Sequence, residues 1–124
     1  MNNVRILIID DEAEFCSIIL ESLIEFGYEV KCVHNCETAI EMCGTFMPHI
    51  ILLDVMLADE SGIDVLGKLR SIDKQVRIIM ISGLLDLEIA KEAIALGAED
   101  YVTKPINLLK LNDVIQELTN GIIS

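Results

Sequence analysis

The sequence has no tryptophan and few other aromatic residues, with only three phenylalanines and two tyrosines in 124 residues. Its hydrophobic residues make up 52% of the chain, and they are mainly Ile, Leu, Val and Ala. An aliphatic composition of this kind suits a parallel sheet that is covered on both faces. Basic residues are also scarce, since nine Lys and Arg stand against 21 Asp and Glu and give a formal net charge of -12. Because such a surface repels polyanions, we expect no direct binding to nucleic acid.

Long hydrophobic runs are absent as well. The first apolar stretch follows Arg5 and ends at the acidic residues 10–12, so it is too short for a signal peptide or a membrane span. We therefore expect a cytoplasmic protein with no membrane association. A length of 124 residues allows one domain with a substantial core, and we expect a single domain over residues 1–124.

The cysteines lack the paired spacing that is typical of zinc-binding motifs. Cys16, Cys32, Cys36 and Cys43 are the four, and His34 lies between two of them in the sequence. We expect small buried thiols in a reducing compartment rather than disulfides or a metal site.

Short apolar segments alternate with amphipathic stretches along the whole chain. The apolar segments predict strands at residues 4–9, 28–33, 50–53, 76–81 and 101–103. The stretches between them predict helices with apolar residues at helical spacing: Phe15 to Phe26 before Gly27, Ala39 to Cys43 after a capping Asn35, Ile63 to Leu69 after Gly62, Leu87, Ala90 and Ile94 before Gly97, and Leu108 to Leu118 after Pro105.

Strands that alternate with helices in this way form a parallel sheet with helices on both faces. A dinucleotide-binding Rossmann order would need a glycine-rich turn after the first strand, but Asp10, Asp11 and Glu12 stand there instead. We therefore predict an α/β fold of the flavodoxin-like, doubly wound type, with five strands in the order 2-1-3-4-5 and five helices. This order makes the first and third strands neighbours.

Polar residues follow four of the predicted strands, and the carboxyl ends of parallel strands meet at one edge of the sheet. These residues are Asp10 with Asp11, Asp54, Ser82 and Lys104. Carboxylates a few ångströms apart repel by about 4 kcal/mol per pair at an effective dielectric constant of 20, so they stay ionised together only around a cation. All-oxygen ligands favour Mg²⁺.

The same residues predict phosphoryl chemistry at Asp54. Its carboxylate can attack phosphorus if the cation and Lys104 neutralise the incoming charge, and Ser82 can donate to a phosphoryl oxygen. Each residue taken alone has an ordinary structural explanation, such as a helix-capping acid or a surface lysine. The interpretation depends on their convergence at strand ends.

The chain resembles the receiver domain of two-component response regulators over nearly its whole length. The matching segments are residues 8–12 (IIDDE), 52–56 (LLDVM), 81–83 (ISG) and 97–105 (GAEDYVTKP). The resemblance implies that Asp54 accepts a phosphoryl group from a sensor histidine kinase or a histidine phosphotransfer protein. It also implies that the chain catalyses only its own phosphorylation and dephosphorylation.

Further residue roles follow from the resemblance. Mg²⁺ would be bound by Asp11, Asp54 and the backbone carbonyl of Met56, with Asp10 acting directly or through water. Ser82 and Tyr101 would form a switch pair that passes the signal to the face of the fourth helix, fifth strand and fifth helix. A downstream effector protein or output domain would bind there. The resemblance also implies a cis peptide bond between Lys104 and Pro105.

The chain departs from the family pattern after Asp54. Ala58 stands where proline is common, and Asp59 and Glu60 add acidic charge to the same loop. Met56 and Leu84 stand at positions that influence how water reaches the acyl phosphate, and neither side chain can polarise a water molecule. We therefore expect slow self-dephosphorylation.

Three other functions compete with this interpretation. A phosphatase of the haloacid dehalogenase type would need an acid two residues after the nucleophile, where Met56 stands, and a flavodoxin would need a phosphate-binding loop after the first strand. A receiver fold used as a phosphorylation-independent interaction module stays open. Residues 105–124 contain only one base, Lys110, so the charged dimer face of many regulators is not evident and we expect a monomer or weak dimer.

Overall fold

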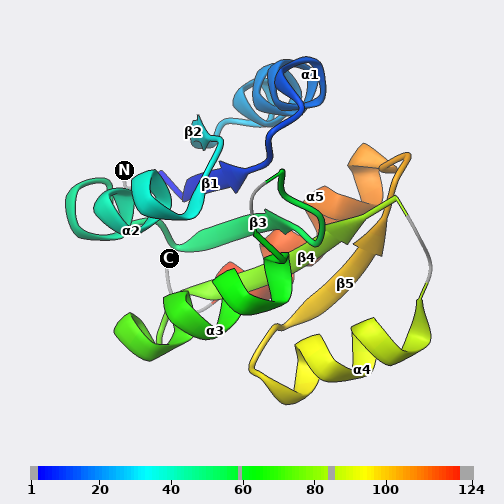
Figure 1. The fold of residues 1–124 in the computed structure, drawn as a ribbon. Coiled ribbons are helices and arrows are strands. Elements are labelled where there is room, and N and C mark those ends of the chain that lie inside the picture. The colour runs from blue at the N-terminus through cyan, green and yellow to red at the C-terminus, as the bar shows by residue number, and fades with distance from the viewer. Residues whose placement is uncertain (1–2, 59, 84–85, 121–124) are drawn as a thin grey trace.

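A computed structural model of the chain describes residues 3–58, 60–83 and 86–120, within which five strands alternate with five helices (Figure 1). The strands are β1 (Arg5–Ile9), β2 (Glu29–Val33), β3 (Ile50–Asp54), β4 (Arg77–Ser82) and β5 (Asp100–Thr103). The helices are α1 (Ala13–Glu25), α2 (Cys36–Thr45), α3 (Gly62–Ile72), α4 (Leu87–Ala95) and α5 (Leu108–Thr119).

The strands form one parallel sheet in the order β2-β1-β3-β4-β5, as the sequence predicts. The strand register brings the carboxyl ends together. Ile9 of β1 pairs with Leu53 of β3, the neighbouring Asp54 pairs with Ile81, and Ser82 pairs with Thr103. The predicted site residues at the ends of β1, β3, β4 and β5 therefore lie along one edge of the sheet.

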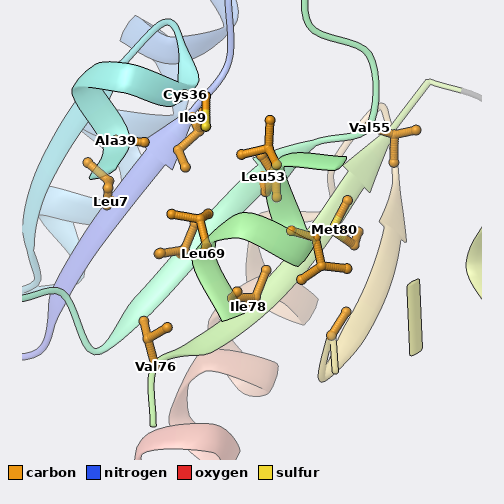
Figure 2. Close-up of a cluster of buried hydrophobic side chains, with 14 of the residues drawn as sticks. Leu7, Ile9, Cys36, Ala39, Leu53, Val55, Leu69, Val76, Ile78 and Met80 are labelled. Carbon is orange, nitrogen blue, oxygen red and sulfur yellow. The ribbon is translucent and has the colours of Figure 1, made fainter. Parts of the chain in front are cut away.

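Aliphatic cores cover both faces of the sheet. On one face α2, α3 and α4 pack against alternate strand residues, including Leu53, Ile78 and Met80 (Figure 2). On the other face α1 and α5 pack through residues such as Leu23 and Leu111 against the intervening strand positions. Because each central strand is apolar on both sides, β1, β3 and β4 are almost completely buried.

The helix ends follow the predicted signals, but the buried side of α4 does not. Asn35 caps α2 by accepting a hydrogen bond from the Thr38 amide at 2.9 Å, and Gly97 follows α4 with a positive φ of 107°. Leu87 and Ile94, expected on the apolar face of α4, are 65% and 50% exposed. The helix buries Ala93 instead, with Ile89 packed beside it. Leu87 and Ile94 therefore lie on a side of the helix that is turned away from the sheet, whereas Ala90, the third predicted residue, is half-buried.

The fifth helix buries Leu111 and Ile115, which lie in its predicted apolar stretch, against the sheet, and Lys110 is exposed. Asn112 is half-buried, and its side-chain oxygen accepts a hydrogen bond from the Tyr28 hydroxyl. None of the helices in the described part of the chain combines the length and apolar character that a bilayer span requires.

Candidate functional site

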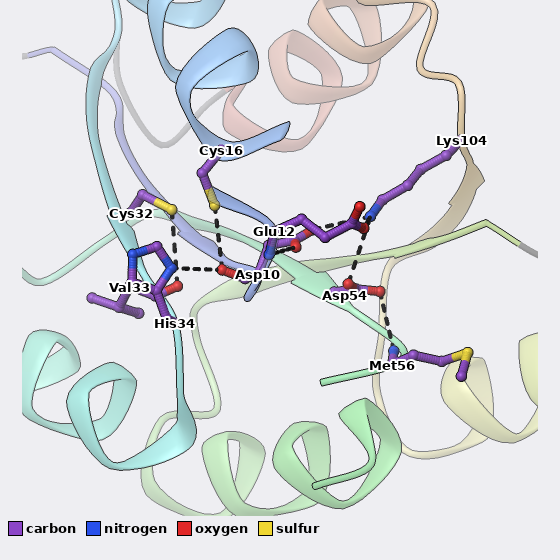
Figure 3. A network of polar contacts seen from close by, with 9 residues as sticks. All are labelled: Asp10, Glu12, Cys16, Cys32, Val33, His34, Asp54, Met56 and Lys104. Carbon is purple, nitrogen blue, oxygen red and sulfur yellow. Dashed lines mark hydrogen bonds and ion pairs between the residues drawn. The ribbon is translucent and has the colours of Figure 1, made fainter. Parts of the chain in front are cut away.

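Asp10 follows β1 and lies at the centre of the candidate site (Figure 3). Its side chain is held from two directions, because Oδ1 accepts a hydrogen bond from the Glu12 amide at 2.8 Å and Oδ2 lies 3.1 Å from Lys104 Nζ. Only 1% of the residue is exposed. A buried carboxylate of this kind needs a positive partner, which Lys104 supplies.

Asp54 is the last residue of β3 and is 5% exposed. Its Oδ1 accepts a hydrogen bond from the Met56 amide at 3.1 Å, while Oδ2 lies 3.6 Å from Lys104 Nζ. Burial raises the pKa of Asp54 to about 6, and the nearby Asp10 charge adds to the rise. The Met56 amide and the Lys104 ammonium oppose this rise in pKa. Asp54 is thus a desolvated carboxylate whose negative charge is only partly compensated.

Lys104 follows β5 and joins the acids of the site. Its Nζ lies 2.7 Å from Glu12 Oε1 as well as close to Asp10 and Asp54, and it stands 4.1 Å from the centre of the Phe15 ring. Burial lowers the pKa of Lys104, but hydrogen bonds to Glu12 and Asp10 outweigh it and keep the pKa above its ordinary value. The lysine is therefore a permanent cation at neutral pH.

The bond between Lys104 and Pro105 is cis, as the resemblance implies. The Lys104 amide donates to the carbonyl oxygen of Ser82 at 2.7 Å, which connects the ends of β4 and β5. Ser82 itself is 2% exposed and, like Asp54, lies at the carboxyl end of its strand. Tyr101 on β5 is half-buried and packs against the core formed with α2, α3 and α4. The structure thus places both predicted switch residues on adjacent strands.

The carboxylates of Asp10, Glu12 and Asp54 each offer an oxygen within 4.8 Å of the others. Three hard oxygen donors at this spacing fit a divalent cation such as Mg²⁺, with water completing its shell. Asp11, which the sequence places in the site, is exposed and does not belong to this group of described residues. Glu12 was not predicted as a site residue, although it continues the acidic run that signalled the site.

The loop after Asp54 packs tightly against α3. Gly62 donates to the Val55 carbonyl oxygen at 2.7 Å, and a Cβ at Gly62 would lie 2.1 Å from the backbone oxygen of Asp54. Glu60 from the same loop pairs with Lys68. Met56 is 66% exposed beside the site. Asp59 and Leu84, which the sequence analysis singled out, lie outside the described residues.

Phe15 is a further contact of the site that sequence reasoning assigned only to the helix core. Its ring lies under the Lys104 ammonium, where a cation–π interaction contributes about 0.5–1 kcal/mol when exposed and more when desolvated. No pattern in the sequence connects residues 15 and 104, so only the fold could reveal this contact.

Comparisons with known proteins agree with this geometry. The family model of the response regulator receiver domain matches residues 6–116. The chain is 33% identical over 90% of its length to the regulatory protein AtoC of Escherichia coli strain K12, of which it spans 24%. It is 32% identical to the chemotaxis protein CheY of Bacillus subtilis strain 168, covering 94% of this chain and 98% of that protein.

A solved structure has the same fold. It is the crystal structure of a two-component response regulator from Clostridium difficile, which is 26% identical and superposes with a TM-score of 0.92 over 98% of this chain and 100% of that one. The chain thus has nearly the length of one relative and spans about a quarter of another.

Proposed function

The chain belongs to the response regulator receiver domain family of two-component signal transduction, and on that premise we propose that Asp54 accepts a phosphoryl group from a histidine kinase or a histidine phosphotransfer protein. Receiver domains are signalling domains rather than conventional enzymes. One observation carries the proposal. Asp54 is a buried carboxylate at a strand end, with the Lys104 ammonium 3.6 Å away and two further acids within reach of a shared cation.

The transfer begins with attack by a carboxylate oxygen of Asp54 on phosphorus. A new O–P bond forms, the P–N bond to the donor imidazole breaks, and the released imidazole nitrogen takes a proton from solvent, so that Asp54 becomes an acyl phosphate. Only the ionised carboxylate attacks, and a pKa of about 6 leaves most of Asp54 ionised at neutral pH. Lys104 is positioned to stabilise the negative charge that arrives with the phosphoryl group.

Mg²⁺ is the cofactor that the acidic group fits. When bound, it would draw negative charge from the phosphoryl oxygens. We assign its binding to Asp11, Asp54 and the carbonyl of Met56, with Asp10 binding directly or through water. The exposed Asp11 is accessible to a hydrated ion.

The signal then leaves through Ser82 and Tyr101 towards the surface of α4, β5 and α5. A phosphoryl group adds charge and acceptors at one end of the sheet, and a hydroxyl that moves towards it shifts the packing of neighbouring elements. Exposed Leu87, Ile94 and Leu109 on α4 and α5 support this surface as the place where an effector protein or output domain binds. We propose a monomer or weak dimer, since Lys110 is the one base in α5.

Intact mass spectrometry tests phosphoryl transfer directly. We would incubate the protein with Mg²⁺ and acetyl phosphate, with Asp54→Asn and a chelator as parallel controls. A single base-labile phosphoryl adduct that is lost in both controls would support the proposal. No adduct on a folded protein that binds Mg²⁺ would refute it, and would favour a phosphorylation-independent interaction module.

A further inference from the structure

Two thiols and an imidazole from separate parts of the sequence meet beside Asp10. Cys16 comes from α1, Cys32 from β2, and His34 follows the end of β2. Their two sulfur atoms and one ring nitrogen lie within 4.8 Å of one another. Figure 3 shows them grouped on one side of Asp10, whereas Lys104 and Asp54 lie on the other. This thiol–imidazole cluster touches the backbone of Asp10 but contains none of the side chains assigned to the proposed phosphoacceptor site.

The cluster lines a cavity of about 230 Å³. Ser17 and Glu21 also line it, and none of its described lining residues is a lysine or an arginine. Cys16 is buried, Cys32 is half-buried and His34 is exposed, so an ion can reach the sulfur atoms past the imidazole. An accessible cavity with neutral and acidic walls admits a cation.

We infer that Cys16, Cys32 and His34 form a binding site for a thiophilic metal ion of the zinc type. Two thiolates and one imidazole are ligands that zinc prefers, and a tetrahedral ion would keep a fourth position for water or a carboxylate. Ligand atoms around tetrahedral zinc lie about 3.5 Å apart, given Zn–S and Zn–N bonds near 2.3 and 2.0 Å. Cys32 is half-buried and His34 is exposed, so rotation of these two side chains can bring the three ligand atoms closer together.

The surrounding hydrogen bonds hold the metal-free cluster in place. His34 Nδ1 lies 2.8 Å from the Asp10 carbonyl oxygen, on the side of the ring that faces Asp10 and the two sulfur atoms (Figure 3). The Cys16 thiol donates to the same carbonyl oxygen at 3.3 Å. A metal ion bound by this nitrogen and by the two sulfur atoms would replace the contacts of His34 and Cys16 with the Asp10 carbonyl oxygen. That oxygen therefore gathers two of the three ligands in the metal-free protein.

A cysteine binds a metal ion as a thiolate, so a metal ion must displace the protons of both thiols. Metal binding is consequently expected to release protons and to strengthen as the pH rises. Thiols that serve only as packing groups would show neither effect.

The experiment uses the whole chain, reduced and metal-free, with excess Mg²⁺ to fill the acidic group and no phosphodonor. We would titrate it with Co²⁺, whose thiolate charge-transfer bands report sulfur ligation, and then displace Co²⁺ with Zn²⁺. One Co²⁺ per chain with thiolate bands is the expected result. Because no phosphoryl transfer is measured, the outcome is independent of the proposed function.

Single variants identify the ligands. Cys16→Ser, Cys32→Ser and His34→Gln should each weaken metal binding by at least roughly tenfold. Cys43→Ser is the matched control, since Cys43 is also half-buried but packs against the opposite face of the sheet. Its affinity should equal that of the wild type. Absence of thiolate bands in the folded wild type, or equal loss in the Cys43 variant, would overturn the inference, and circular dichroism of each variant excludes unfolding as the cause.

Discussion

The ammonium nitrogen of Lys104 lies 3.1 Å from Oδ2 of Asp10, so the lysine serves as a cation within the acidic group. The same nitrogen reaches Glu12 and Asp54 at 2.7 and 3.6 Å. Carboxylates that would repel one another are thereby stabilised together before any metal binds. A divalent cation that enters the group must compete with Lys104 for these oxygens.

Replacing Lys104 should therefore affect metal binding and phosphorylation in opposite directions. In Lys104→Met, Mg²⁺ affinity should rise several-fold, because the competing ammonium is lost. Phosphorylation by acetyl phosphate should fall by about a hundredfold or more, because the incoming charge loses a stabilising group. Calorimetric Mg²⁺ titration and the mass assay measure the two effects.

Lys110→Met is the control for this variant. It changes the net charge equally but removes an exposed lysine on α5. Both readouts should stay at the wild-type value. If Lys104→Met weakened Mg²⁺ binding, competition between lysine and metal would be the wrong description of the site.

Asp11 and Glu12 should contribute differently to Mg²⁺ binding. Asp11→Asn removes a proposed ligand and should lower Mg²⁺ affinity by roughly tenfold or more. Glu12→Gln removes a partner of Lys104 and should leave the affinity near that of the wild type. The two substitutions change the net charge by the same amount, so each serves as the other's control. If Glu12→Gln lost more Mg²⁺ affinity than Asp11→Asn, the metal ligands would instead be Asp10, Glu12 and Asp54, the group of carboxylates that contains Glu12.

Asp54→Asn should stabilise the metal-free protein at neutral pH. The folded-state pKa of Asp54 is raised from 3.8 to about 6, so its ionisation favours the unfolded state. The protonated Asp54 side chain favours the folded state, and this stabilisation is complete below about pH 4 and is lost as the pH rises through 6. The variant should gain up to about 3 kcal/mol at pH 7–8 and little at pH 4. Urea unfolding with a chelator measures the difference.

Two controls test this explanation. Asp113→Asn alters an exposed acid on α5 and should change the unfolding free energy little at either pH. Saturating Mg²⁺ should shrink the advantage of Asp54→Asn, because a bound cation stabilises the carboxylate that the variant lacks. An Asp54→Asn variant equally stable or less stable than wild type at pH 8 would contradict a destabilising Asp54 charge.

The strands of the sheet were predictable because the hydrophobic pattern that identifies each strand lies within one short segment of the sequence. Continuous apolar runs identify β1, β3 and β4 as strands buried on both faces, and the acid after β1 excludes a dinucleotide-binding turn. The side of α4 that faces the sheet was not predictable. Its apolar residues surround the helix, so Leu87 and Ile94 looked as suitable for burial as Ile89 and Ala93.

The site residues that directly follow a strand were predictable, because the carboxyl ends of parallel strands meet at one edge of the sheet. The contacts of Lys104 with Glu12 and Phe15 depend on side-chain direction, which spacing in the sequence does not determine. Cys16 and Cys32 likewise have no motif spacing, since a helix and a strand bring them together. These features required the three-dimensional structure.

Met56→Asn should accelerate loss of the phosphoryl group. Met56 is 66% exposed beside Asp54 and offers water no strong hydrogen-bonding group, so we expect a long-lived acyl phosphate. An amide at this position can orient the attacking water and should shorten the half-life several-fold. Decay of the mass adduct after removal of the phosphodonor measures it. Met47→Asn, at an exposed residue near the opposite end of β3, should leave the decay unchanged. A wild-type half-life of seconds that Met56→Asn does not alter would contradict the explanation.

Gly62→Ala should distort the backbone that carries Asp54. The added Cβ would lie 2.1 Å from the Asp54 carbonyl oxygen and 2.7 Å from the Val55 Cα, so the start of α3 must move away. We expect a loss of about 1–3 kcal/mol in unfolding free energy and slower phosphorylation. Gly67→Ala is the control within the same helix, because nothing lies within 4 Å of its Cβ, and it should gain about 0.5–1 kcal/mol. If both variants were stabilised and phosphorylated normally, close packing at Gly62 would not be what positions Asp54.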